Sequence, residues 1–373
     1  MRRLLLVAAA LAGLTASAAR RNGFGTEAFW ACVPTGQVAS VAFSPVAYEL
    51  DCAAISELFD PIRRAAFAEA VGAMTGWQDV YDPIRAQYAG AVTNGLQTVS
   101  ARALLMPRLK HADADFRVRL MRDYAVTSCP LRPSRFGAEC WLRTTMEGQM
   151  EDIVLDPALA PSNAVSFVDF ESVRFAFLNP LSGTGTVAFA AADGRSLPLP
   201  AVTGEIETDL WETERFTCLR LPLAASSTLN LLLPAEGVTV DGLRGELDDD
   251  RLERLRLAFL SVSERGVSHD RLALTLPRLE FDSRLDLLPA FARQNLSLDE
   301  MTMVSGGALA AVHQRLRLSF NGSLPPSELK KAPVARSRRA PRPFAVDRPF
   351  VFFVYHEPTL TIPAMGVFTG CGE

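Results

Sequence analysis

Short catalytic motifs are missing from the 373 residues of this sequence. It has no nucleophile elbow, no phosphate-binding loop and no zinc-protease helix. Histidine is scarce, and the four histidines lack the spacing of metal ligands; they are His111, His269, His313 and His356. These absences argue against an enzyme and against a metal or organic cofactor.

Cysteine pairs of the C-x-x-C type are also absent. The six cysteines are spread along the chain, at Cys32, Cys52, Cys129, Cys140, Cys218 and Cys371. Six cysteines allow many full pairings, and the sequence alone does not choose among them. Cys129 and Cys140 are the closest pair, and the prolines between them suggest a loop that a disulfide could close.

Long hydrophobic runs are limited to the beginning of the sequence. Two arginines are followed by eleven apolar or small residues, Leu4–Leu14, and then by the Ala-x-Ala pattern of residues 16–18. This combination is typical of a secretory signal peptide, and the apolar run is too short to span a bilayer comfortably. We therefore expect a signal peptide over residues 1–18, one domain over residues 19–373, and a secreted or periplasmic protein of the extracellular space. No cysteine follows the signal directly, so we expect no lipoprotein anchor.

Strong charge of either sign is lacking as well. The formal net charge is −4, and it becomes −6 when cleavage removes Arg2 and Arg3. Mild acidity argues against a nucleic-acid-binding protein. No later segment is apolar enough to predict a membrane span, and no internal repeat is visible. With 49% hydrophobic residues the chain can bury a large core.

The last quarter of the chain contains the clearest strand signals. Residues Ala310–Phe320 alternate in a strand-like manner, and Leu360–Phe368 is a second short strand signal. Between them, Phe350–Tyr355 is a nearly continuous apolar run, which is typical of a strand buried on both faces.

A long polar segment, Asn321–Arg348, separates these strands. It contains five prolines and, from Lys330 to Arg342, six basic residues, and it has no apolar period. Segments of this length without secondary structure are uncommon in compact domains and are usually functional. We interpret it as a loop within one fold and not as a domain linker.

Together these features resemble the C-terminal end of a serpin. The resemblance is carried by the Val312–His313 pair in a strand, the long loop, the Pro349–Phe350 pair that re-enters the fold, and Met365–Gly366 near the end. Further upstream, the Phe43–Pro45 segment resembles the Phe-Ser-Pro that opens a central helix in this family, with Ser44 as its cap.

The resemblance implies a fold class and a set of site residues. It implies a mixed α+β fold with three β-sheets, about eight or nine helices and an exposed reactive-centre loop. Ser44, His313, Pro349 and Phe350 would be structural residues, with His313 beneath the sheet. Asp169 stands where the family usually has asparagine.

The implied function is inhibition of a serine-type endopeptidase, to which the loop is offered as bait. The residue before the cut bond would be Arg338, with Arg336 and Arg339 as close rivals. The partner would be a trypsin-like serine protease. Clustered Lys and Arg also attract polyanions, so a sulfated or phosphorylated polymer is a second candidate partner. A solvated basic loop with no target is the remaining reading. We expect a monomer.

The start of the loop departs from the family pattern. The hinge consists of Asn321, Gly322, Ser323, Leu324, Pro325 and Pro326. In the family, the cleaved loop inserts into a sheet as an extra strand, but proline cannot donate to a strand ladder. Glu328 or Lys330 would also be buried in one register, and Lys331 in the other. The alternative function is therefore a non-inhibitory serpin-fold protein that is cleaved as a substrate or acts as a binding module.

We predict that limited proteolysis cuts first between Arg336 and Ala340. Proline and basic composition favour an exposed, poorly packed loop there, and a trypsin-like protease cleaves after arginine. The measurement is mass spectrometry of the fragments at early times. A first cut within the N-terminal third of the chain would contradict the assignment of the loop.

Overall fold

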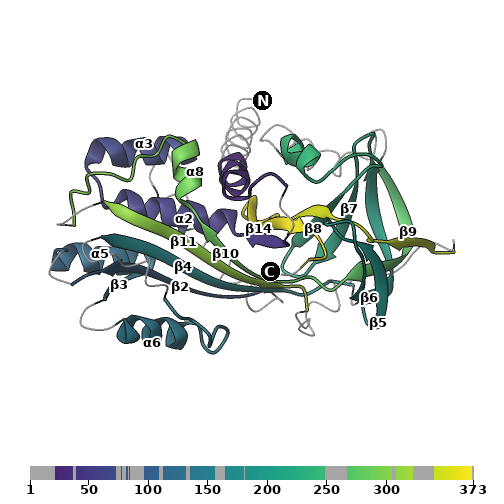
Figure 1. The fold of residues 1–373 in the computed structure, drawn as a ribbon, viewed down its shortest axis with the longest axis horizontal. Helices are drawn as coiled ribbons and strands as arrows, with labels where there is room; N and C mark the ends of the chain where they lie inside the picture. Colours follow the sequence, from purple (N-terminus) through teal and green to yellow (C-terminus); the bar gives the residue numbers. More distant parts are fainter. Residues whose placement is uncertain are drawn as a thin grey trace, which may run out of the picture.

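Strands dominate the structure, as the short apolar runs of the sequence predict. The structure is a computed structural model in which the described residues are 22–36, 39–72, 77, 81–82, 84, 96–108, 112–131, 135–155, 164–179, 181–247, 267–304, 308–321 and 340–371. The described strands form two hydrogen-bonded sheets, and most of the helices lie along one of them (Figure 1).

The first sheet has five strands in the order β10-β11-β4-β2-β3. They are β10 (Glu280–Asp286), β11 (Leu309–Ser319), β4 (Val165–Phe175), β2 (Leu96–Met106) and β3 (Val126–Pro130). The predicted strand at Ala310–Phe320 is thus confirmed as β11. Strands β11 and β4 are parallel and directly adjacent, whereas β4 and β2 are antiparallel.

The second sheet has nine strands. In order they are β1 (Val41–Phe43), β14 (Thr361–Phe368), β13 (Phe350–His356), β8 (Ser227–Pro234), β7 (Phe216–Leu223), β6 (Ser196–Glu212), β9 (Val267–Pro277) and β12 (Arg342–Ala345), with β5 (Gly183–Ala190) paired to β6. The family resemblance implied three sheets, and two of them are joined in this one. They are joined because β6 is 17 residues long and pairs with β5 and β9 as well as with β7.

Several helices pack against the two sheets. They are α2 (Pro45–Ser56), α3 (Pro61–Val71), α5 (Ala114–Tyr124), α6 (Phe136–Thr145), α8 (Leu288–Arg293) and the 3-10 helix η4 (Asp241–Leu247), and residues 22–32 are also helical. The expected total of eight or nine helices falls partly on residues outside the described ranges. No described helix has the length and apolar character needed to cross a membrane.

The start of α2 confirms the predicted cap. Ser44 has extended backbone angles, its side chain accepts a hydrogen bond from the Ala47 amide, and Pro45 occupies the first turn. A capping hydroxyl satisfies an amide that the helix itself leaves unpaired, and proline loses nothing at this position. Eleven of the twelve α2 residues are buried, so the helix lies inside the molecule.

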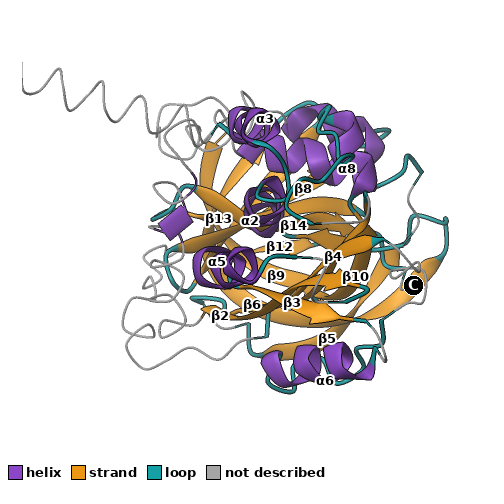
Figure 2. Cartoon of the chain, turned by 90° about the vertical axis from the view of Figure 1, so that its left-hand side faces the viewer, coloured by secondary structure: helices purple, strands orange, loops and turns teal. Residues whose placement is uncertain are grey.

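Two separate cores lie on the two faces of the five-stranded sheet. On one face, Leu104, Phe167 and Val312 pack with residues of α2. On the other, Ala103 and Val168 pack under α6 with a smaller set of apolar side chains. Figure 2 shows α6 on one side of β2 and β3 and α2 on the other. The sheet is therefore covered on both faces, which explains why few side chains of its central strands are exposed.

The six cysteines are all free thiols. Cys129 lies in β3 and is buried, which raises the pKa of its thiol to about 11. Cys140 lies in α6 and is half-buried. The suggested disulfide between these two residues is therefore absent from the structure.

We predict that Gly366→Ala destabilises the protein by about 2 kcal/mol or more, as overpacking of a core does. A Cβ at Gly366 would overlap the carbonyl oxygen of Val41 and lie 2.7 Å from the Phe352 ring. The measurement is urea unfolding. Gly137→Ala is the control, because nothing lies within 4 Å of its Cβ in α6; we expect a gain of about 0.5–1 kcal/mol from helix propensity. Equal effects of the two substitutions would refute the packing at β14.

Candidate functional site

The candidate site is the seam between β4 and β11, together with the two ends of the long loop. Ten residues of β11, from Leu309 to Ser319 with one irregularity, pair with β4, so the two strands are neighbours along their length. The end of β11 leads directly to the loop, and the chain returns at Ala340 and enters β12 beside β9. The five long strands run side by side in Figure 1.

The first hinge residue is held at the surface. Asn321 is exposed, its side-chain amide donates to Glu280, and its side-chain oxygen accepts from the Ser319 hydroxyl, at 3.3 and 3.0 Å. These contacts fix the point at which β11 ends and the loop begins. The other hinge residues, Gly322 to Pro326, and the three candidate scissile residues, Arg336, Arg338 and Arg339, lie outside the described residues.

Beneath the seam, β11 is tied to the start of α2. The Ser44 amide donates to the Gln314 side-chain oxygen at 2.8 Å, and the Gln314 amide group donates to the Ser44 carbonyl at 3.3 Å. Both residues are buried. Ser44 therefore caps α2, as predicted, and its backbone also binds β11.

His313 does not lie at this contact. Side chains alternate between the faces of a strand, so His313 points to the face opposite Gln314. On that face β11 carries Ala311, which packs in the core under α6, and Arg315, which binds Asp152. His313 is only partly buried there.

Four charged side chains are buried next to Gln314. Arg102 of β2 approaches three carboxylates: Asp51 of α2 at 3.0 Å, Asp169 of β4 at 3.4 Å, and Glu171 of β4 at 3.2 Å. The side chains of Arg102 and Glu171 are 8% and 12% exposed, and those of Asp51 and Asp169 are fully buried. We call these four residues the buried charge cluster.

The buried charge cluster contains more acid than base. Burial raises the pKa of Asp51 well above its ordinary value, and the neighbouring Asp169 raises it further. Burial also raises the pKa of Asp169 to about 7 against the opposing effect of Arg102. The pKa of Glu171 is raised by burial as well, and that of Arg102 is raised by the carboxylates around it. Three carboxylates thus share one guanidinium in a site with little water.

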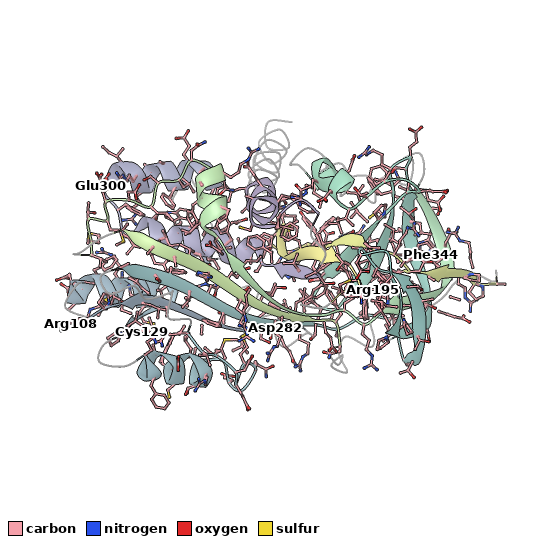
Figure 3. The ribbon with its side chains drawn as sticks, viewed as in Figure 1. Arg108, Cys129, Arg195, Asp282, Glu300 and Phe344 are labelled. Atoms are coloured by element: carbon pink, nitrogen blue, oxygen red, sulfur yellow. The ribbon has the colours of Figure 1, made fainter. Side chains whose placement is uncertain are left out.

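A second charged network lies on the opposite face of the same strands, near the end of α6. Arg315 binds Asp282 of β10 at 2.8 Å and Asp152 at 2.6 Å; Arg317 binds the same two carboxylates at 2.6 and 3.3 Å. Figure 3 labels Asp282 on the side of the sheet that faces α6. Asp152 follows α6 in the chain, so it ties that helical segment to β10 and β11. We call these four residues the α6-side clamp.

The return of the chain after the loop is structural, as expected. Phe350 is fully buried at the start of β13, and its ring stacks on Phe368 of β14 at 5.3 Å. Pro349 directly precedes this strand and is half-buried. Together they fix where the second end of the loop enters the large sheet.

Sequence reasoning missed both charged groups of residues. Arg102, Asp51 and Asp152 carried no motif, and Asp169 was noted only as a departure from the family's asparagine. A signal was nevertheless present: Asp169 and Glu171 interrupt a strand whose other residues on that face are apolar. Among the described residues, no group of three or more His, Cys, Asp or Glu side chains is arranged to hold a metal ion.

The comparisons with known proteins agree with this geometry. The family profile described as "Serpin (serine protease inhibitor)" matches residues 138–370, which is more than half of the chain. The chain therefore belongs to the serpin family.

The chain is similar to several individual members. It is 25% identical over 256 residues to an uncharacterized serpin-like protein of Thermococcus kodakarensis and 22% identical over 257 residues to plasminogen activator inhibitor 1 of Bos taurus. These matches cover 61% and 62% of this chain but only 54% and 60% of the length of the two relatives.

Solved structures show the same fold at low sequence identity. Native protease nexin-1, crystallised with heparin, has a TM-score of 0.77 at 16% identity, covering 95% of this chain and 99% of that one. Serpin-12 of Manduca sexta has a TM-score of 0.75 at 12% identity, covering 94% and 98%. The predicted serpin-like α+β fold is confirmed.

We predict that Asp152→Asn weakens the α6-side clamp and destabilises the protein by about 1 kcal/mol, the usual scale for a partly exposed ion pair. Hydrogen bonding from Arg315 lowers the pKa of Asp152, so its contribution is present at neutral pH. The contribution is lost as the pH falls through the lowered pKa. Urea unfolding at pH 7 and in acid measures both effects.

The control for this prediction is Asp347→Asn. Asp347 contacts only its exposed neighbour Arg348 among the ion pairs of the described residues, at 3.3 Å. We expect no measurable loss from it. If Asp152→Asn and Asp347→Asn behaved alike at both pH values, the clamp would not stabilise the fold.

Proposed function

We propose that this protein is a secreted serine-type endopeptidase inhibitor that offers its basic loop to a trypsin-like protease. The observation that carries the proposal is the seam. Two parallel strands, β4 and β11, lie side by side, and β11 continues into the loop. A loop cleaved near Arg338 has its N-terminal half attached to the strand beside which it would have to insert.

Insertion has a defined mechanical requirement. A new strand between β4 and β11 would move them apart by roughly 4.8 Å, the spacing of neighbouring strands. Strand addition provides main-chain hydrogen bonds to both neighbours in return. The protease, joined to the loop as an acyl-enzyme, would be displaced with it, and inhibition depends on this happening before the acyl bond is hydrolysed.

The buried charge cluster offers a binding partner to the lysines whose burial would otherwise oppose insertion. If the loop doubles back beside β11 after a turn of three residues, residue 324 lies opposite Phe320 and Lys330 lies opposite Gln314. A turn of four residues places Lys331 there instead. Residues opposite each other in antiparallel strands share a face, so this lysine would face Asp169 and its neighbouring carboxylates. A buried lysine is costly when unpaired, but here it would meet uncompensated negative charge.

The prolines favour the alternative function. Pro325 and Pro326 each lack a donor for the ladder, and they stand at the beginning of the segment that would insert. If they prevent insertion, the protease cleaves the loop and leaves, and the protein is a substrate or a binding module. A polyanion that binds the basic loop remains a candidate partner in either case.

The experiment is to mix the protein with an arginine-specific serine protease and to separate the products on a denaturing gel. We expect a band of the combined mass that resists SDS, because trapping preserves the acyl bond. A clean cut with no such band would overturn the inhibitor proposal and support the substrate function. The triple variant Arg336→Gln, Arg338→Gln, Arg339→Gln is the control and should give neither product.

Thermal unfolding of the cleaved protein gives an independent readout. If the loop inserts, it adds a strand and its ladder, and the midpoint rises by tens of degrees after cleavage at arginine, which leaves Lys330 and Lys331 intact. The prolines and charged residues of the hinge segment predict a small change instead, and a large rise would show that the loop inserts despite them. A cleaved Lys330→Met, Lys331→Met variant tests the charge argument. If a lysine pairs with Asp169, its replacement should reduce the rise, whereas an equal or larger rise would show that the lysines oppose insertion.

A further inference from the structure

The buried charge cluster cannot hold all of its formal charges at once. Three carboxylates and one guanidinium would carry a net charge of −2 in a region with exposed fractions between 0 and 12%. A buried charge without a partner is strongly disfavoured, and a carboxylate in such a place takes up a proton instead. The geometry itself therefore requires proton sharing.

Unpartnered oxygen atoms show where a proton would go. Asp51 Oδ2, Glu171 Oε2 and both Asp169 oxygens are buried and lack a well-formed hydrogen bond. The contacts of Asp169 are the Arg102 guanidinium, at 3.4 Å, and the neighbouring Gln314 side chain. A protonated carboxyl is a donor, so one proton between two of these carboxylates supplies a hydrogen bond and removes a charge at the same time. Loss of that proton leaves neighbouring carboxylates that repel each other.

The other groups around the cluster do not replace this proton. From α2, Tyr48 and Cys52 face the same interior, and burial raises the pKa of both well above neutrality, so they stay neutral. Glu49, also on α2, accepts a hydrogen bond from the Tyr81 hydroxyl at 2.9 Å. From β11 the neighbour is Gln314, and from the start of α2 it is Ser44, neither of which titrates.

The position of the cluster connects its charge to the seam. Asp169 of β4 is the register partner of Gln314 of β11, and Gln314 is bonded on its other side to Ser44. Repulsion around Asp169 therefore acts on the pair of residues that joins β4, β11 and α2. We propose that the buried charge cluster is a proton-operated latch: with a shared proton it holds the β4–β11 seam closed, and release of the proton to solvent loosens the seam.

The direction of the pH effect follows from linkage. The pKa of Asp169 in the folded protein, about 7, lies above its value in the unfolded chain. Its stabilising contribution is thus complete below the unfolded pKa and is lost as the pH rises through about 7. His356 titrates in the opposite sense, because burial lowers its pKa to about 4. Its contribution grows as the pH rises toward the ordinary pKa of histidine, so it opposes the loss from Asp169 and does not imitate it. The loss begins near the ordinary pKa of an aspartate and is complete just above pH 7. The range from pH 6.5 to 8.5 covers its last part, in which the folded protein itself releases the proton.

The test compares the intact wild-type protein with Asp169→Asn, in which an amide replaces the protonated carboxyl. Thermal midpoints are measured from pH 6.5 to 8.5. We expect the wild-type midpoint to fall with pH by a few degrees more than that of the variant. Asp152→Asn, on the other face, should keep the wild-type slope. Parallel slopes for wild type and Asp169→Asn would overturn the proposal.

Two further measurements keep the proposal testable if Asp169→Asn does not fold. Infrared spectroscopy of the wild type detects the carbonyl band of a protonated carboxylic acid. This band should be present at pH 6.5 and diminish toward pH 8.5; its absence at pH 6.5 would refute the shared proton.

Hydrogen exchange, corrected for its intrinsic pH dependence, should show faster opening of β4 and β11 than of β7 and β8 at the higher pH. Uniform exchange behaviour would refute the link to the seam. No protease is used, so failure here is distinct from failure of the inhibitor proposal.

Discussion

The pairing of β4 with β11 is the contact on which the rest of the structure depends. It closes a five-stranded sheet whose two central neighbours are parallel, an arrangement that is stable only when both faces are covered. One face is covered by α2 and its aromatic core, and the other by α6. The buried charge cluster and the α6-side clamp hold this pairing, whereas an inserting loop would have to separate it.

Charge is distributed differently on the two faces of the seam. The α6-side clamp is partly exposed and balanced, with two arginines and two aspartates, so it contributes modestly and responds to acid. The buried charge cluster is enclosed and unbalanced, so its contribution depends on a proton or on an added cation. The α6-side clamp stabilises the closed sheet at neutral pH, whereas the buried charge cluster makes the stability of the sheet depend on ionisation.

Part of the site could be predicted because its determinants are local. Ser44 followed by proline gives a cap and a helix start in any context, and the apolar run of Phe350–Tyr355 predicts a doubly buried strand. Both are confirmed. His313 and Gln314 illustrate the limit: one residue along a strand reverses the face, and the choice of face depends on pairing with β4, which the sequence of β11 does not contain.

The sequence by itself determined the family, the order of the strands near the C-terminus, the cap of α2 and the basic, proline-rich character of the loop. These depend on side-chain chemistry, turn residues and short-range alternation. Only the tertiary structure decided that the long β6 joins two sheets into one, that Cys129 and Cys140 remain thiols, and that Arg102 meets three carboxylates. The physical reason is that each of these features combines residues of elements far apart in the sequence, and their burial and mutual distances exist only after those elements pack together.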